Sequence, residues 1–274
     1  MQKKRLDVLI VEKKLAESRN QAQRLIMAGE VLVNGNQSLK PSETFLDEVV
    51  IKLKDSPPFL SRGGEKLEAA LQAFRLTGLE GKVCADIGAS TGGFTDCLLQ
   101  HGAGKVYAVD VGYGQLHWKL RNDARVVVME KNNVRNLQKL PDEVDLVVVD
   151  VSFISLRTIF PVLKNLMKTA NADMITLIKP QFEAGRQEAA KGRGVIKDHT
   201  VHYKVLKTVL QSAQEQGLYL HGLIQSPIKG PKGNIEFLAH FRLEPAKEKL
   251  ETYIQSIMNT MDGVNELKQT HRRK

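Results

Sequence analysis

Residues 82–101 read KVCADIGASTGGFTDCLLQH, and their character changes twice along this stretch. The residues from Lys82 to Ile87 are mostly apolar and predict a buried strand, whereas those from Thr91 to His101 predict a helix. Between them stands a glycine-rich turn, where small residues let the backbone approach a neighbouring group closely. Strand, tight turn and helix in this order indicate an α/β fold with a mainly parallel sheet.

The same alternation continues beyond this stretch, since apolar runs separated by helical segments recur along the chain. They predict further strands at 106–110, 126–129, 146–149, 175–178 and 236–241. We therefore expect an α/β domain over residues 61–243. Residues 244–274 predict a charged amphipathic helix that packs on the domain, followed by a frayed basic end, and we assign no function to them.

The first 54 residues predict a separate small α+β domain. One short helix is expected over 6–15, and Ser18 is placed to cap a second helix over 19–27 that ends at Gly29. Residues 31–33 and 49–53 read as strands, with Asn34-Gly35 as a tight turn. Prolines in residues 55–60 predict a stiff linker.

The run SRNQAQRLIMAGEVLVNG, residues 18–35, resembles the S4 RNA-binding domain. The resemblance implies that Arg19, Arg24 and Lys40 contact RNA phosphates, to which guanidinium groups bind through paired hydrogen bonds. Without the resemblance, solvated helix charges would explain these residues equally well. The formal net charge of +9 agrees with an anionic partner but is only modest support.

Other sequence features favour a cytoplasmic protein. The N-terminus lacks the continuous apolar segment of a secretory signal, and no run approaches the ~20 apolar residues that span a bilayer. Cys84 and Cys97 offer no disulfide framework, which fits a reducing compartment. We therefore expect a cytoplasmic protein with no membrane partner.

The glycine-rich turn does not have the pattern of a dinucleotide or nucleotide triphosphate site. Ser90 stands where G-x-G-x-x-G requires glycine, and no Gly-Lys-Ser/Thr follows. Asp86, which ends the first strand, suits an amino-acid ammonium, and Asp110, at the tip of the second, is placed to accept ribose hydroxyls. This arrangement resembles the S-adenosyl-L-methionine (SAM) site of class I methyltransferases. The resemblance implies SAM as the cofactor, with Asn133 at the adenine, and binding by Asp86, Gly88, Ser90, Gly92, Gly93, Phe94, Thr95, Asp110, Val111 and Asn133.

Four charged residues form a second candidate set: Lys66 in SRGGEKL, Asp150 after VVV, Lys179 in IKPQF and Glu236 in GNIEF. Because ligands bind beyond the carboxyl ends of parallel strands, Asp150 and Lys179 should face the same crevice as the turn. The set resembles the Lys-Asp-Lys-Glu tetrad of FtsJ-like ribose 2′-O-methyltransferases. Together with the S4-like segment and the motifs DVSFISL and IKPQFEAG, the chain resembles the TlyA (haemolysin A) family.

The resemblance implies a seven-stranded Rossmann-like sheet, ribosomal RNA or ribosomal subunits as partner, and 2′-O-methylation of a ribose. Lys179 would orient the hydroxyl and stabilise the developing alkoxide, or take its proton. Asp150 and Glu236 would hold the lysines, and Lys66 would complete the charge balance. No metal is expected, because the seven histidines show no ligand spacing.

Alternatives remain at this point. Glu236 would serve equally in an edge-strand ion pair, and Lys66 as a helix cap. The basic segment 185–194 reads either as a mobile lid over RNA or as an ordinary surface loop. For the whole chain, the haemolysin name suggests a membrane-lytic protein, and the S4-like segment suggests a non-catalytic assembly factor. The missing membrane segments argue against the first, and the intact tetrad against the second.

Overall fold

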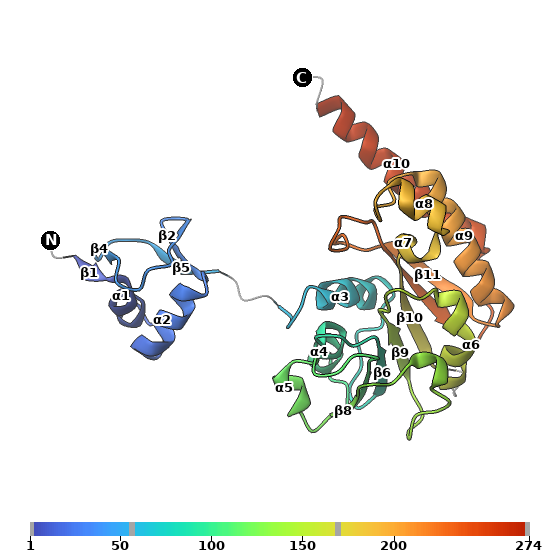
Figure 1. Ribbon diagram of the computed structural model, residues 1–274, viewed down its shortest axis with the longest axis horizontal. Helices are drawn as coiled ribbons and strands as arrows, with labels where there is room; N and C mark the ends of the chain where they lie inside the picture. The colour runs from blue at the N-terminus through green and yellow to red at the C-terminus, as the bar shows by residue number, and fades with distance from the viewer. Residues whose placement is uncertain (1–2, 55–57, 168–170, 272–274) are drawn as a thin grey trace. The chain divides into compact units, whose positions relative to one another are not determined.

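The computed structural model describes residues 3–54, 58–167 and 171–271. The chain divides into two compact units, Met1–Pro58 and Phe59–Lys274 (Figure 1). Each unit has its own hydrophobic core. Half of the expected linker, residues 55–57, and the basic end at 272–274 lie outside the described residues.

The first unit is a small α+β domain. Helix α2 (Arg19–Met27) has the expected bounds, and Ser18 Oγ accepts the backbone N–H of Gln21 at its start. Asn34 and Gly35 both take positive φ, as a two-residue hairpin turn requires. The other elements are β1 (Lys4–Arg5), α1 (Leu6–Glu12), β2 (Val31–Val33), β3 (Asn36–Gln37), β4 (Thr44–Phe45) and β5 (Ile51–Leu53).

The second unit contains a seven-stranded sheet with the order β11-β12-β10-β9-β6-β7-β8. Neighbouring strands from β10 to β8 are parallel, whereas β12 runs antiparallel to β10 and β11. The prediction of a mainly parallel sheet is confirmed. The strands are β6 (Val83–Ile87), β7 (Lys105–Val109), β8 (Val126–Met129), β9 (Leu146–Val149), β10 (Asp173–Ile178), β11 (Tyr219–Gln225) and β12 (Phe237–Arg242).

Helices cover both faces of this sheet, and a separate apolar cluster fills each interface (Figure 1). One face carries α3 (Gly63–Ala73), α4 (Gly93–Gln100) and the short α5 (Trp118–Arg121). The other carries α6 (Leu156–Leu166), α9 (His199–Glu215) and α10 (Leu250–His271). The remaining helices are η1 (Val134–Asn136), α7 (Pro180–Glu183) and α8 (Arg186–Lys191).

Several segments differ from expectation. Strand β11 forms where the apolar runs predicted no strand, and α1 ends at Glu12 rather than at residue 15. The segment 185–194 contains helix α8 rather than loop alone, and the C-terminal helix begins at Leu250 rather than at Glu244. Its residues Ile254, Met258 and Met261 are buried in the core, so the helix packs on the domain as expected. No helix in the described part of the chain is both long and apolar enough to cross a membrane.

Candidate active site

The candidate site lies at the carboxyl ends of β6, β9 and β10, where the backbone turns away from the sheet. Gly88, Asp150 and Lys179 each come directly after the last residue of one of these strands. Two adjoining cavities open here, with volumes of about 760 and 490 Å³. They share a wall that includes Gly88 and Asp150. The topology therefore provides two neighbouring binding spaces at one edge of the sheet.

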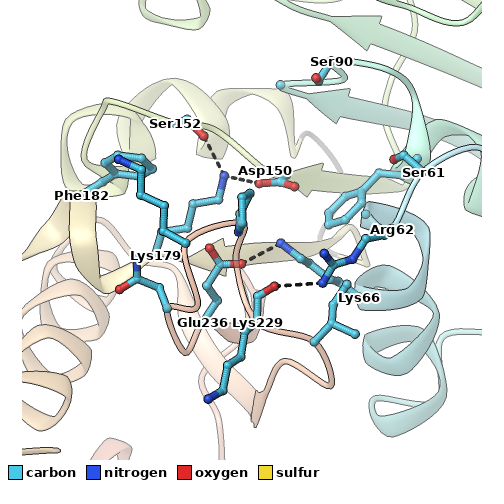
Figure 2. Close-up of a pocket in the computed structure, with 18 of the residues that line it drawn as sticks. Ser61, Arg62, Lys66, Ser90, Asp150, Ser152, Lys179, Phe182, Lys229 and Glu236 are labelled. Atoms are coloured by element: carbon cyan, nitrogen blue, oxygen red, sulfur yellow. Dashed lines mark hydrogen bonds and ion pairs between the residues drawn. The ribbon is translucent and has the colours of Figure 1, made fainter. Parts of the chain in front are cut away.

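The larger cavity brings together the four charged residues expected from the sequence (Figure 2). They form two ion pairs. Lys66 Nζ lies 2.6 Å from Glu236 Oε2, and Lys179 Nζ lies 2.5 Å from Asp150 Oδ1. Each lysine therefore has its own carboxylate, so Lys179 is not held between the two acids.

The two pairs differ in their access to water. The side chains of Lys66 and Glu236 are 9% and 1% exposed, and the Gln181 amide donates a further hydrogen bond to Glu236 Oε1 at 3.1 Å. The Lys179 side chain is 10% exposed and also donates to Ser152 Oγ at 2.9 Å, whereas Asp150 is 21% exposed. The two pairs thus differ in their carboxylates: Glu236 is buried, whereas Asp150 is partly exposed to the cavity.

Lys66 lies in the first turn of a helix that two glycines start. Gly63 and Gly64 open α3, and this turn packs against the start of α4. A Cβ at Gly93, the first residue of α4, would lie 3.0 Å from the Gly64 nitrogen, so the close approach of the two helices requires glycine. Glu236 arrives from the opposite side, directly before β12 rather than within it.

The glycine-rich turn folds tightly against the end of β9. Gly88 has a φ of +89°, and a Cβ there would lie 2.6 Å from the Asp150 carbonyl oxygen. Both the backbone conformation and the close approach therefore require glycine. Ser90, Gly93 and Phe94 of the predicted cofactor set line the larger cavity. Gly92, at a φ of +95°, caps the start of α4.

Asp86 lies beneath this turn rather than at its surface. Its side chain is fully buried, and Oδ2 accepts the Thr95 hydroxyl at 2.7 Å. Within the described part of the chain, Oδ1 has no hydrogen-bond partner. Burial raises the pKa of Asp86 to about 7, and the nearby Asp150 and Asp110 carboxylates add to this rise. A cation beside this buried carboxylate would therefore stabilise its charged form.

The smaller cavity contains the remaining predicted cofactor residues, Asp110, Val111 and Asn133. Asp110 accepts the backbone N–H groups of Gly112 at 2.6 Å and Ser90 at 2.8 Å, one on each oxygen. Each carboxylate oxygen has further acceptor capacity. The Asn133 side-chain oxygen caps the turn at Arg135 N, 3.1 Å away. These contacts fix the polar groups of the cavity before any ligand is present.

Sequence reasoning missed two phenylalanines at the larger cavity. Phe153 is 89% exposed and takes a φ of +64°, which is strained for a bulky residue. Its ring centroid lies 5.0 Å from that of Phe182. Each phenylalanine follows a tetrad residue by three positions, in DVSF and KPQF, and this repeated spacing is the signal that was available.

In the first unit, the predicted RNA face has an organising residue that the sequence did not reveal. Asp7 is fully buried, and its carboxylate accepts hydrogen bonds from Arg5, Arg19 and Gln23 at 2.8–3.0 Å. Arg5, with help from Gln23 and Arg19, holds the pKa of Asp7 well below its usual range. Arg19 remains about half exposed, and Arg24 and Lys40 are exposed. Arg5 thus shares the Asp7 carboxylate with Arg19 of the predicted set.

One cluster has the residue types of a metal site. Ligand atoms of Glu68, Cys97 and His101 lie within 4.8 Å of one another. The Glu68 carboxylate is paired with His101 Nε2 at 2.6 Å, and burial raises the pKa of the Cys97 thiol. A hydrogen bond between Glu68 and His101 beside a buried, protonated thiol accounts for this arrangement.

Comparison with known proteins identifies the family of each unit. Residues 59–243 match the model of the FtsJ-like methyltransferase family, and residues 4–51 match that of the S4 domain. The chain is 49% identical to YqxC, a candidate rRNA methyltransferase of Bacillus subtilis, over 87% of this chain and 85% of the relative. It is 44% identical to the 16S/23S rRNA (cytidine-2′-O)-methyltransferase TlyA of Mycobacterium tuberculosis, over 88% and 90%.

A solved structure agrees in fold over the full length. A candidate hemolysin from Streptococcus thermophilus has 43% identity and a TM-score of 0.73, with 99% of each chain covered. The family models, the similarity to these relatives and the observed sheet order lead to one assignment. The chain belongs to the TlyA (haemolysin A) family, in which an S4 domain precedes an FtsJ-like methyltransferase domain.

Proposed function

We propose that this protein transfers a methyl group from SAM to a ribose 2′-hydroxyl of ribosomal RNA. The observation that carries the proposal is the meeting of Lys66, Asp150, Lys179 and Glu236 in one cavity that adjoins the glycine-rich turn. Relatives that share most of the chain are named as rRNA (cytidine-2′-O)-methyltransferases. A cytidine of either ribosomal subunit is therefore the expected target.

The smaller cavity fits the cofactor. Asp110 offers acceptors for ribose hydroxyls, Asn133 offers an amide for the adenine edge, and the tight turn at Gly88 forms part of the cavity wall. The buried Asp86, with one oxygen free of partners in the described structure, supplies negative charge for an ammonium. When bound, SAM supplies an electrophilic methyl group.

The larger cavity fits the nucleotide. Phe153 and Phe182 offer aromatic faces at its wall, on which a base turned out of its stack can be held. Lys179 Nζ, which faces the cavity, donates a hydrogen bond to the 2′-oxygen and stabilises the negative charge that develops there. Asp150, 2.5 Å from this ammonium and partly exposed, accepts the hydroxyl proton and passes it to solvent.

Lys66 and Glu236 position the site rather than react. Their pair joins α3 to the start of β12, segments 170 residues apart in sequence. Because Gln181 also binds Glu236, the loop after β10 is fixed relative to both elements. Lys179 begins that loop, so the pair holds its backbone in place.

The S4 domain supplies affinity for RNA. Arg19, Arg24 and Lys40, together with Arg5, would bind phosphates, a contact that releases counterions and depends on salt. A catalytic domain that selects the hydroxyl and a separate domain that binds the surrounding RNA divide the task between them.

The test is methyl transfer from labelled SAM to undermethylated small and large ribosomal subunits, followed by mass spectrometry of nuclease digests. We expect a 2′-O-methylcytidine that Lys179→Ala abolishes while RNA binding persists. Transfer to a base atom, or full activity of Lys179→Ala, would refute the proposed chemistry. Ser61→Ala serves as a matched control in the same cavity.

A further inference from the structure

The segment from Val111 to Arg121, VGYGQLHWKLR, exposes its aromatic residues and buries its leucines. Tyr113 and Trp118 are 72% and 64% exposed, whereas Leu116 and Leu120 are 4% and 3% exposed. Trp118 is the only tryptophan of the chain. The leucines anchor the segment in the core beside Gly92, so the exposure of the rings does not arise from poor packing.

The backbone of this segment is held at several points. Gly112 N donates to Asp110 Oδ1 at 2.6 Å, Gln115 N donates to Glu130 Oε1 at 3.2 Å, and His117 N donates to the Thr91 carbonyl at 3.2 Å. Helix α5, which starts at Trp118, packs on the edge strand β8. Aromatic side chains on a fixed backbone lose little conformational freedom when a flat partner stacks on them.

Positive charge accompanies the rings. Lys131 Nζ lies 4.3 Å from the centroid of the Tyr113 ring, and Lys119 and Arg135 are exposed nearby in the sequence. The acidic neighbour Glu130 is paired with Arg121. Aromatic faces interleaved with cations are the composition of surfaces that bind single-stranded nucleic acid. The cores of protein–protein interfaces, in contrast, are depleted of lysine.

The segment also borders the candidate active site. Val111, Gln115 and Arg135 line the smaller cavity, and Phe153 lines both that cavity and the larger one. Two exposed apolar side chains, Val111 and Phe153, therefore line the same cavity. A strand whose target nucleotide enters the larger cavity can continue across this cleft.

We propose that Tyr113 and Trp118, with Lys119 and Lys131, form a stacking surface for unpaired nucleotides that flank the methylated position. The inference rests on the proposed RNA methylation and adds a substrate contact to it. The partner is single-stranded RNA, because duplex RNA keeps its base faces covered.

Trp118 is itself the probe, since it is the single tryptophan and its emission can be excited separately from that of the five tyrosines. The full-length protein is titrated with a fluorescein-labelled oligoribonucleotide of about ten nucleotides, and binding is followed by anisotropy and by tryptophan emission. We expect emission to be quenched with the same midpoint as the anisotropy change. A duplex of the same sequence should bind without quenching. Binding of the single strand without quenching would overturn the inference, as would quenching by SAM alone.

Variants separate this surface from the catalytic machinery. Tyr113→Ala and Trp118→Ala should each raise the KM for ribosomal subunits about ten-fold, the size expected for one lost base–aromatic contact. The KM for SAM and kcat should stay unchanged, and Tyr113→Phe should behave as wild type. A raised KM for SAM would instead make the segment a cofactor contact and refute the inference.

The outcomes for the two proposals can be told apart. Methyl transfer by the wild-type protein without quenching of Trp118 would leave the proposed function standing and remove the stacking surface. Quenching by single-stranded RNA without methyl transfer would support the surface and refute the proposed reaction.

Discussion

Replacing Lys66 with methionine tests what the buried ion pair contributes to stability. The substitution keeps most of the side-chain volume and removes the charge, which leaves the Glu236 carboxylate, 1% exposed, with the Gln181 amide as a donor. Removing one partner of a buried pair costs about 3–5 kcal/mol. Because Gln181 still donates a hydrogen bond, we expect ~3 kcal/mol. In a domain of roughly 200 residues this lowers Tm by about 6–12 °C.

The assay is thermal unfolding followed by circular dichroism, with methyl transfer measured in parallel. The double variant Lys66→Met with Glu236→Leu should recover most of the lost stability, because two apolar groups replace a desolvated pair. Neither variant should methylate RNA. An unchanged Tm for Lys66→Met would refute the claim that the pair is buried. A double variant as unstable as the single one would show that an unpaired carboxylate is not the cause of the loss.

Three further substitutions give contrasting results. Lys179→Met should lower kcat by about 10³-fold, which steady-state kinetics measures. The same variant should shift Tm by less than about 2 °C, because water can solvate the partly exposed Asp150, and calorimetry measures this shift. Burial raises the pKa of Asp86 to about 7, so the folded protein binds more protons than the unfolded chain between about pH 4 and pH 7. Its stability without cofactor should therefore fall as the pH rises through this window, and urea unfolding of Asp86→Asn should show a flatter profile. Asp7→Asn should weaken RNA binding and reduce its salt dependence, because Arg5 and Arg19 lose the carboxylate that fixes them; an unchanged salt slope would contradict this.

Much of the fold could be predicted because local chemistry dictates it. Ser18 can cap α2 from its own hydroxyl, and Gly29, at a φ of +75°, ends that helix in the conformation expected of glycine. The apolar runs give the parallel strands in the same way. The segment 185–194 was predicted wrongly as a loop, because its glycines are typical of loops. It contains RQEAAK, a run of good helix formers that folds as α8.

The start of the last helix also has a local cause in the sequence. Pro245 restricts Glu244 to extended backbone, so a helix cannot begin at Glu244. The helix begins five residues after the proline, at Leu250.

The sequence predicted which four charged residues meet in the candidate site, but not which lysine pairs with which carboxylate. Residues at the ends of parallel strands share one edge of the sheet, which brings Asp150 and Lys179 together without any long-range information. Glu236 reaches that edge because β12 inserts antiparallel between β10 and β11, a topological fact that no local pattern contains. The partner of Lys66 therefore could not be read from the sequence. Exposure of Phe153 could not be read either, since an apolar residue after a strand is usually buried.

The division of the tetrad into two pairs has a consequence for the proposed chemistry. Lys66 pairs with the buried Glu236 carboxylate, which the Gln181 amide also binds, so the charge of Lys66 is compensated and its position is fixed. Lys179 has a partly exposed carboxylate as its partner. The Ser152 hydroxyl also contacts its ammonium, and the centroid of the Phe182 ring lies 5.9 Å away. Its ammonium has three N–H donors, and exchanging the neutral Ser152 contact for a ribose hydroxyl keeps the Asp150 pair intact. The hydroxyl thus meets a cation that already has an acceptor beside it. For this reason we assign the reacting role to Lys179 and the positioning role to Lys66.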